Sequence, residues 1–376
     1  MIKNDIRSAL KQALENCYQQ GVLTSGEYPA EIQLEVPKNP EHGDYASNLA
    51  MMLARHEGKP PRQIAEVLVI ALRANALFDA VDIAGPGFIN FRLAAGYWAT
   101  VLHRIYAEQD TFGRSQVGAG IKVQVEFVSA NPTGPLHIGH GRGAVVGDAL
   151  ASILDAAGFD VQREYYINDA GNQVQTLGRS ILLRLRELQG EVVDFPADGY
   201  QAVYITELAA RLRQEQGELA ALNEEEAINR CTRFGVEQIL AWIDSDLKAF
   251  GIEFDNWYSE QSLYDRNMVE QELGRLKEKG LTYEEDQALW LSTTDFGDDK
   301  NRVLIKSDGS YTYFASDVAY HLEKFDRGFD RVIDVWGADH HGYIPRMKAM
   351  LKGFGLPAEA LEVLLIQMVN LLRDGQ

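Results

Sequence analysis

Hydrophobic and polar positions in the first 112 residues predict a small domain that mixes helices and strands. The chain opens with a helical apolar pattern, MIKNDIRSALKQALENCYQQ, and then passes through the strand-like EIQLEVP. The polar turn KNPEHGDYASN leads into a helix expected from Leu49 to Arg55. FDAVDIAGPGFINFRL alternates like two strands around a Gly-Pro-Gly turn, and a connecting helix is expected from Tyr97 to Gln109. We predict an α+β domain over residues 1–112.

The pattern changes in GRSQVGAG, which is rich in glycine and lacks periodicity. The apolar run IKVQVEFVSA follows, then a loop rich in proline and glycine, the helical GAVVGDALASILDAAG and a second strand, VQREYYIND. Strand, helix and strand in this order form the βαβ unit of α/β proteins. We therefore predict that residues 113–376 form an α/β nucleotide-binding domain.

The region from about residue 172 to 285 is mostly helical and charged, and we interpret it as an insertion between two halves of this fold. ALWLSTT and RVLIKSDGSYTYF are predicted strands, with SDGS as a hairpin turn. DRVIDVWGADHHGYIPRMKAMLKGFG predicts strand, loop and helix. The runs EEEAIN and DDKNR are expected to be solvated faces.

The composition indicates a globular protein of more than one domain. A chain of 376 residues exceeds what one core usually supports, and 46% hydrophobic with 24% charged residues is ordinary. No stretch approaches the roughly 20 apolar residues of a membrane span, and the amphipathic start is unlike a cleavable signal. We expect a cytoplasmic protein with no membrane association. Cys17 and Cys231 are too few and too far apart for a disulfide framework or a cysteine zinc site, so no zinc is expected.

The formal charge of −19 lowers the expectation of nucleic-acid binding, because affinity for phosphates comes largely from lysine and arginine. Net charge reports solubility and nonspecific attraction rather than site chemistry. Any RNA binding would have to use local basic patches.

The segment SANPTGPLHIGHGRG carries the strongest indication of chemistry, because it lies between a predicted strand and a predicted helix, where open α/β sheets bind ligands. Gly139 and Gly141 permit close approach of a nucleotide. His137 and His140 lie three positions apart and could face one phosphate together at the positive end of a helix. They are the candidate catalytic pair, able to stabilise charge on a pentavalent α-phosphate.

An HxxH pair by itself has two other readings. Isolated pairs are commonly surface or capping histidines, and a metal-binding pair is the other alternative. Zinc would need a further ligand nearby, and the nearest carboxylate, Asp148, is better explained as a residue of the helix.

The full context Asn-Pro-Thr-Gly-Pro-Leu-His-Ile-Gly-His is more specific than the pair and carries the HIGH motif of class I aminoacyl-tRNA synthetases. The segments EFVSANPTGPLHIGHGRGAVVGDALA, REYYINDAGNQ, SDGSYTYFASDVAYH and VWGADHHGYIPRMKA resemble bacterial arginyl-tRNA synthetases, and the resemblance spans essentially the whole chain. It implies a Rossmann-type class I catalytic domain over residues 113–376 with a helical insertion, and a tRNA-contacting α+β domain over residues 1–112.

The resemblance implies an arginine–tRNA ligase, which activates L-arginine with ATP to arginyl-adenylate and transfers the arginyl group to the 3′ end of tRNA(Arg). ATP is then a substrate, accompanied by Mg²⁺, and we expect a monomer. The ATP-binding residues that it implies are His137, Gly139, His140, Gly141, Gly337 and Asp339. The arginine-binding residues that it implies are Glu126, Ser129, Asn131, His137, Tyr313, Asp317 and His340.

The resemblance implies that Asp317 binds the guanidinium group of arginine and that Tyr313 packs over the substrate or forms a hydrogen bond with it. A guanidinium group is best recognised by a buried carboxylate that accepts two parallel hydrogen bonds and by an aromatic wall. Asp317 and Tyr313 are four positions apart on a predicted helix and would share a face. The alternatives are a helix-terminal or surface carboxylate at Asp317 and a core position for Tyr313, and the loop at residues 337–341 could instead form a metal site or a helix cap.

In the N-terminal domain, Asn39, His42, Tyr45 and Asn48 form a polar and aromatic patch that could contact unpaired tRNA bases. The alternative is a turn and helix cap that holds the small domain together.

In the family that the chain resembles, a KMSK-type loop whose lysines hold the triphosphate follows this region, and a helical anticodon-binding domain comes after it. The chain ends with LLRDGQ where that loop would begin, and Lys306 and Lys348 are isolated. We interpret the chain as a catalytic fragment lacking the C-terminal domain, and expect severely weakened adenylation with the fold and arginine pocket retained. The rival readings are another HIGH-bearing nucleotidyltransferase and a noncatalytic tRNA-binding or assembly protein built from a synthetase fold.

Overall fold

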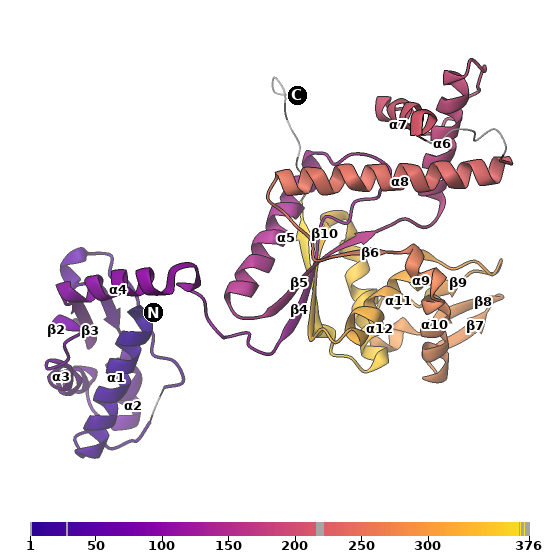
Figure 1. The fold of residues 1–376 in the computed structure, drawn as a ribbon. Coiled ribbons are helices and arrows are strands. Elements are labelled where there is room, and N and C mark those ends of the chain that lie inside the picture. Colours follow the sequence, from indigo (N-terminus) through magenta and orange to yellow (C-terminus); the bar gives the residue numbers. More distant parts are fainter. Residues whose placement is uncertain (1, 28, 216–221, 368, 370–371, 373–376) are drawn as a thin grey trace. The chain divides into compact units, whose positions relative to one another are not determined.

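The structure is a computed structural model that describes residues 2–27, 29–215, 222–367, 369 and 372 (Figure 1). It divides into two compact units, residues 1–114 and 115–376. The division lies two residues from the boundary that the glycine-rich segment predicts. Apart from Leu372, the LLRDGQ segment lies outside the described residues.

The first unit packs helices against a small antiparallel sheet of strand order β1-β3-β2. Its main elements are α1 (Ile2–Gln19), β1 (Tyr45–Ser47), α2 (Leu49–Glu57), α3 (Pro61–Leu72), β2 (Phe78–Ala84), β3 (Phe88–Leu93) and α4 (Ala95–Glu108). Ile6, Leu10 and Leu14 recur at helical spacing along α1 and are fully buried, so the period of the sequence sets this core. The expectation of a strand at EIQLEVP is wrong, because this segment forms only a single bridge, between Glu35 and Ala46.

The described part of the second unit is built on a five-stranded parallel sheet of order β11-β10-β4-β5-β6. The strands are β4 (Lys122–Glu126), β5 (Asp160–Ile167), β6 (Asn256–Ser259), β10 (Arg331–Gly337) and β11 (Leu361–Ile366). In this sheet β5, the next strand along the sequence, lies on one side of β4, and β10 lies on the other side of β4. The carboxyl ends of β4 and β10 therefore flank a topological switch point, where open α/β sheets bind ligands.

Helices flank this sheet, as the α/β prediction requires (Figure 1). Those that position the site are α5 (Ile138–Ala156), α11 (Tyr313–Asp326) and α12 (Ile344–Phe354), with the 3₁₀ turn Ala338–Tyr343 between β10 and α12. Val123, Val125 and Tyr165 are fully buried within the strands, since a parallel sheet covered on both faces excludes water throughout.

The helical insertion lies between β5 and β6 and consists of α6 (Asn172–Leu188), α7 (Val203–Glu215) and α8 (Glu224–Ala249). The expected end near residue 285 is wrong, because residues 256–259 already return to the central sheet as β6. The aromatic ring of Trp257 stacks on Tyr165 of β5 with centroids 4.4 Å apart, and this contact favours the strand. The helices α9 (Gln261–Asp265) and α10 (Met268–Glu278) then lead to a second sheet.

This second sheet is antiparallel and comprises β7 (Thr282–Glu285), β8 (Ala288–Leu291) and β9 (Arg302–Ile305). The expectation that YTYF continues a hairpin after SDGS is wrong, because Tyr311 forms only an isolated bridge with Ile305 and α11 begins at Tyr313. Phe314 and Val318 are buried four positions apart, and residues 318–324 of α11 are buried without interruption, so packing around the whole segment favours the helix. Among the described helices, none combines the length and the apolar character that crossing a membrane requires.

Candidate active site

Two adjoining clefts lie at the carboxyl ends of β4 and β10, with volumes of about 550 Å³ and about 490 Å³. Residues of both strand ends, including Val128 and Trp336, line both of them, and so does His140 of α5. We call the larger the first cleft and the smaller the second cleft. The shared lining allows one molecule to extend through both.

His137 and His140 form the N-terminal cap of α5. The backbone N–H of Gly139 donates to His137 Nδ1 at 3.1 Å, and the N–H of His137 donates to His140 Nδ1 at 3.2 Å. The two rings stack with centroids 3.9 Å apart. The two histidines are therefore capping residues, as the alternative reading proposes. The cap also orients the two rings, so it is compatible with a catalytic role.

These contacts also determine where each ring carries its proton. Because both Nδ1 atoms accept hydrogen bonds from backbone amides, the protons of the neutral rings lie on Nε2. Burial lowers the pKa of His140, and the neighbouring His137 lowers it further, so this ring is neutral at pH 7. The pair thus offers two Nε2–H donors at the positive end of a helix.

The first cleft gathers most of the predicted arginine-binding residues, all of which the structure describes. Its lining includes Glu126, Ser129, Asn131, Tyr313, Asp317 and His340, whereas His137 lines only the second cleft. These residues come from the end of β4, the start of α11 and the turn after β10. Residues more than 180 positions apart in the sequence thus line one cleft at the switch point.

Asp317 faces the first cleft as a half-buried carboxylate. Burial raises its pKa to about 6, although the charge of His321 and a hydrogen bond with Tyr343 act in the opposite direction. Lys324 and His321, on the same helix, are paired with other carboxylates, and Asp317 has no ion-pair partner among the described residues. A half-buried carboxylate without an ion-pair partner is stabilised when it binds a cationic ligand.

Glu126 and Ser129 form the wall of the cleft beside β4. Ser129 Oγ donates to Glu126 Oε1 at 3.0 Å and accepts from the backbone N–H of Tyr166 at 3.1 Å. Val128 and Ser129 have φ values of 67° and 39°, in the left-handed region that ordinarily favours glycine. Strained backbone of this kind at the end of a strand is commonly found at functional sites.

The remaining predicted contacts lie at the rim. Tyr313 is 69% exposed, so the core alternative for this ring is wrong. The side-chain amide of Asn131 donates to Gln173 of α6 at 2.7 Å. His340 is exposed, with Nε2 3.6 Å from the Asp339 carboxylate.

Sequence reasoning missed several residues of the first cleft. The hydroxyl of Tyr166 is buried and has no hydrogen-bond partner among the described residues. Glu260 lies close behind it in the core, and burial together with the charge of Asp317 raises its pKa to about 7. Trp336 and Tyr343 complete the aromatic lining. Tyr166 lies at the end of the predicted strand VQREYYIND and within REYYINDAGNQ, one of the segments that carry the family resemblance.

The second cleft contains the expected nucleotide residues His137, Gly139, His140, Gly337 and Asp339. Gly141 is absent from its lining and faces Ile138 instead. The lining that the structure describes includes no lysine or arginine. Over the described residues, no cluster of three or more His, Cys, Asp or Glu side chains could hold a metal ion.

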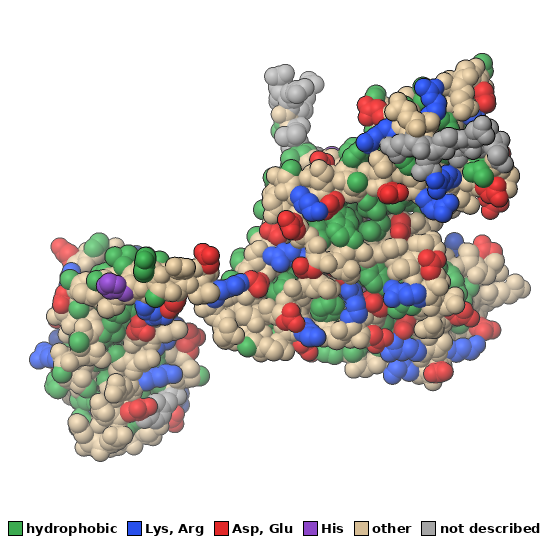
Figure 2. All heavy atoms as spheres, viewed as in Figure 1, with side chains coloured by type: hydrophobic (Ala, Val, Ile, Leu, Met, Phe, Trp, Pro, Cys, Tyr) green, Lys and Arg blue, Asp and Glu red, His purple; other side chains and the backbone are tan. Residues whose placement is uncertain are grey.

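The residues predicted to contact tRNA lie in the first unit and do not line a common hollow. Asn39 Oδ1 caps the 3₁₀ turn Pro40–His42 by accepting from Glu41 N, as the structural alternative proposes. Asn48 lines one hollow and His42 another, while Tyr45 packs against the core. On the face shown in Figure 2, acidic and basic side chains are interspersed.

Comparison with known proteins agrees with this geometry. A family model described as the class I (R) tRNA synthetase catalytic domain matches residues 102–375, and one for the arginyl-tRNA synthetase N-terminal domain matches residues 2–93. The curated arginine–tRNA ligase of Syntrophotalea carbinolica is 60% identical over 100% of this chain and 68% of its own length. A crystal structure of a putative arginyl-tRNA synthetase from Campylobacter jejuni is 39% identical, with a TM-score of 0.70 over 76% of this chain and 62% of that one. The Thermus thermophilus arginyl-tRNA synthetase shares the fold at 23% identity, with a TM-score of 0.65 over 98% of this chain and 66% of that one.

The parallel sheet, the capped histidine pair at its switch point and the catalytic-domain match define the second unit as a class I aminoacyl-tRNA synthetase catalytic domain. Both family models and the high identity to arginine–tRNA ligases show that the chain belongs to the arginyl-tRNA synthetase family. The predicted family, fold class and enzyme class are thereby confirmed. The chain spans 68% of the length of the curated relatives that match it over its whole length.

Proposed function

We propose that the first cleft binds L-arginine and the second cleft binds ATP, so that arginyl-adenylate forms where the clefts meet. The observation that carries this proposal is Asp317, a half-buried carboxylate that faces the first cleft without an ion-pair partner among the described residues. A guanidinium can give such a carboxylate two parallel, charge-assisted hydrogen bonds. Glu126 supplies a second negative charge, and Tyr313, Trp336 and the Tyr166 hydroxyl complete the contacts to the substrate.

The chemistry proposed for the shared region is nucleophilic displacement at phosphorus. A carboxylate oxygen of arginine attacks the α-phosphate of ATP, and the bond to pyrophosphate breaks. The Nε2–H groups of His137 and His140 donate to the oxygens of the α-phosphate, where negative charge increases in the transition state. A hydroxyl of the terminal tRNA ribose then attacks the arginyl carbonyl and releases AMP. Positioning and electrostatics carry both steps, without a covalent enzyme intermediate.

The remaining assignments have support from the family relationship and from sequence. We propose Mg²⁺ as a companion of the ATP phosphates, where the described lining of the second cleft offers no cationic side chain. tRNA(Arg) is the proposed acceptor, with Asn48 and His42 of the first unit among the contacts to its bases. A cytoplasmic monomer remains the expected form.

Calorimetric titration of the chain with L-arginine, L-lysine and L-citrulline tests the amino-acid site. We expect saturable binding of arginine only, because lysine lacks the planar fork and citrulline lacks the charge. Asp317→Asn should abolish this binding. Asp244→Asn is the matched control, since Asp244 is a carboxylate on α8 that pairs with Lys248 away from both clefts.

Two results would count against the proposal. Equal binding of arginine and citrulline would show that the carboxylates do not recognise charge. Failure of arginine to bind, with ATP and tRNA also present, would favour the noncatalytic alternative for this chain.

A further inference from the structure

A row of three carboxylates crosses the central sheet beneath the first cleft. Asp334 of β10, Glu126 of β4 and Glu164 of β5 are register partners on adjacent parallel strands. Residues at one level of a parallel sheet point to the same face, so the three acids lie side by side. Their exposed fractions are 0%, 7% and 0%. Three like charges in a buried layer require compensating cations.

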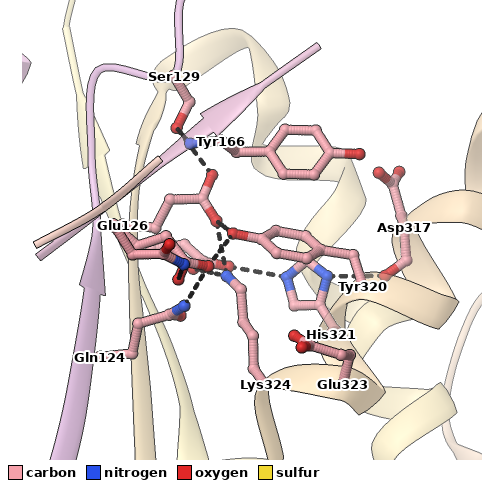
Figure 3. Close-up of polar contacts among 12 residues, drawn as sticks. Gln124, Glu126, Ser129, Tyr166, Asp317, Tyr320, His321, Glu323 and Lys324 are labelled. Carbon is pink, nitrogen blue, oxygen red and sulfur yellow. Dashed lines mark hydrogen bonds and ion pairs between the residues drawn. The ribbon is translucent and has the colours of Figure 1, made fainter. Parts of the chain in front are cut away.

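Helix α11 supplies cations to this row from one of its faces (Figure 3). Lys324 Nζ lies 2.6 Å from Glu126 Oε2 and 2.9 Å from Asp334 Oδ1. Arg327, the C-cap residue of this helix, donates to both oxygens of Glu164 at 2.5 and 2.8 Å. Although burial alone would raise the pKa of Asp334, the charge of Lys324 lowers it to about 2.

His321 makes a further polar contact from this face of α11. Its Nε2 lies 2.9 Å from Asp334 Oδ2, and its Nδ1 lies 2.8 Å from the backbone carbonyl oxygen of Asp317. Both partners are acceptors, so the ring satisfies both only when both nitrogens carry hydrogen. The row of acids is thereby connected to the helical turn that carries Asp317.

Tyr320 makes the second contact to Glu126 from α11. Its hydroxyl lies 2.9 Å from Glu126 Oε2 and 2.6 Å from Glu164 Oε1. The side chain is buried, and its ring packs on Tyr166 with centroids 4.3 Å apart. The hydroxyl carries a single proton and shares it between the two carboxylates, so Oε2 of Glu126 is contacted by Lys324 and, through this shared proton, by Tyr320 of the same helix.

The other oxygen of Glu126 faces a different environment. Oε1 accepts from the hydroxyl of Ser129, and both residues line the first cleft. A carboxylate that recognises a cation loses most of its effect when its position varies by more than about 0.5 Å. The contacts that α11 makes with Oε2 therefore determine how precisely Oε1 is oriented toward a ligand in the first cleft.

We propose that Tyr320 and Lys324 are positioning residues for arginine recognition, which hold Oε2 of Glu126 so that Oε1 keeps one orientation toward the substrate. They also tie Glu126 to α11, the helix that carries Asp317, and so fix the distance between the two recognising carboxylates. This inference rests on the proposed function, because it takes Glu126 as a ligand of arginine. Neither residue acts on the reacting atoms.

Tyr320→Phe tests the proposal with the least disturbance, because the ring and its packing remain and Glu126 keeps Lys324. We expect the Kd for arginine to rise about tenfold, as loss of one hydrogen bond to a charged group predicts. The Kd for ATP should stay within about twofold. Tyr258→Phe is the matched control. Tyr258 is also buried, and its ring centroid lies 4.8 Å from that of Tyr320, but the hydroxyl of Tyr258 accepts from Arg266 and does not contact Glu126.

A double-mutant cycle separates positioning from general stabilisation. If Tyr320 acts through Glu126, Tyr320→Phe will not weaken arginine binding further in a Glu126→Gln background. The same loss in both backgrounds would overturn the proposal. If Tyr320→Phe lowers Tm, a second variant, Lys324→Met combined with Asp334→Asn, takes its place in the same cycle. This variant removes one buried cation together with one buried anion, so the net charge of the layer is unchanged.

Different measured outcomes would contradict the proposed function and the positioning role. Absence of arginine binding by the unsubstituted chain would remove the proposed function. Arginine binding that Asp317→Asn abolishes and Tyr320→Phe leaves unchanged would overturn the positioning role alone.

Discussion

Gly147 of α5 lies directly against the ring of Phe127, so that a Cβ at position 147 would lie 2.2 Å from Phe127 Cγ. Phe127 is fully buried at the end of β4, and the strained residues Val128 and Ser129 follow it. The close approach of α5 to this strand therefore positions both the histidine pair and the wall of the first cleft.

Gly147→Ala should destabilise the protein by about 3 kcal/mol, because neither the helix nor the buried ring can give way without loss of packing. Urea unfolding measures this change. Gly274→Ala is the control, since an added Cβ there meets nothing within 4 Å on the exposed side of α10. It should stabilise the protein by about 0.5–1 kcal/mol through helix propensity. Equal effects of the two substitutions would contradict this account of the packing.

His137→Asn should separate capping from phosphate recognition. Asparagine is a good N-cap residue, so α5 and Tm should be retained. The Nε2–H donor is lost, and the affinity for a non-hydrolysable sulfamoyl analogue of arginyl-adenylate should fall by about tenfold. Calorimetry with the analogue and a thermal melt provide the two readouts. A fall in Tm with unchanged analogue affinity would mean that the histidine serves only as a cap.

Arginine affinity should depend on pH through Asp317, whose pKa burial raises to about 6. The guanidinium binds the ionised form, so affinity is full above this value and falls as pH drops through it. Below about pH 6 the loss should approach tenfold per pH unit, because Asp317 must release a proton when arginine binds. Calorimetry between about pH 5 and pH 8 measures the profile. In Asp317→Glu the profile should persist, whereas a flat profile in the unsubstituted chain would contradict a role for Asp317.

Asp317→Asn should increase stability while it removes arginine binding. The folded-state pKa of Asp317 is raised, so keeping the group ionised in the folded protein costs free energy. This cost is absent below about pH 4, grows as pH rises to about 6, and is constant above. At pH 8 the variant should therefore be more stable by roughly 2 kcal/mol, and at pH 4 nearly unchanged. Urea unfolding at both pH values checks the sign, and a variant that is less stable at pH 8 would refute it.

Part of this site could be predicted from local sequence. The histidine pair, its glycines and the strand before it are contiguous, so their roles at the start of α5 follow from helix capping and strand-end position. The helix that carries Asp317 was predicted through a resemblance, whereas the alternation of YTYF pointed to a strand. The helical spacing of Phe314 and Val318 outweighed that short alternation once the core formed around them.

Local sequence was sufficient for the α/β class of the second unit and for the capped histidine pair, because capping and periodicity act over a few positions, and the family followed from the resemblance of longer segments. The return of residues 256–259 to the central sheet and the row formed by Asp334, Glu126 and Glu164 depend on contacts that form only in the folded chain. Strand order and register place these carboxylates side by side although they are far apart in the chain. No local pattern predicted the contacts of Lys324 and Tyr320 with Glu126, which exist because the packing of α11 brings these side chains over the row.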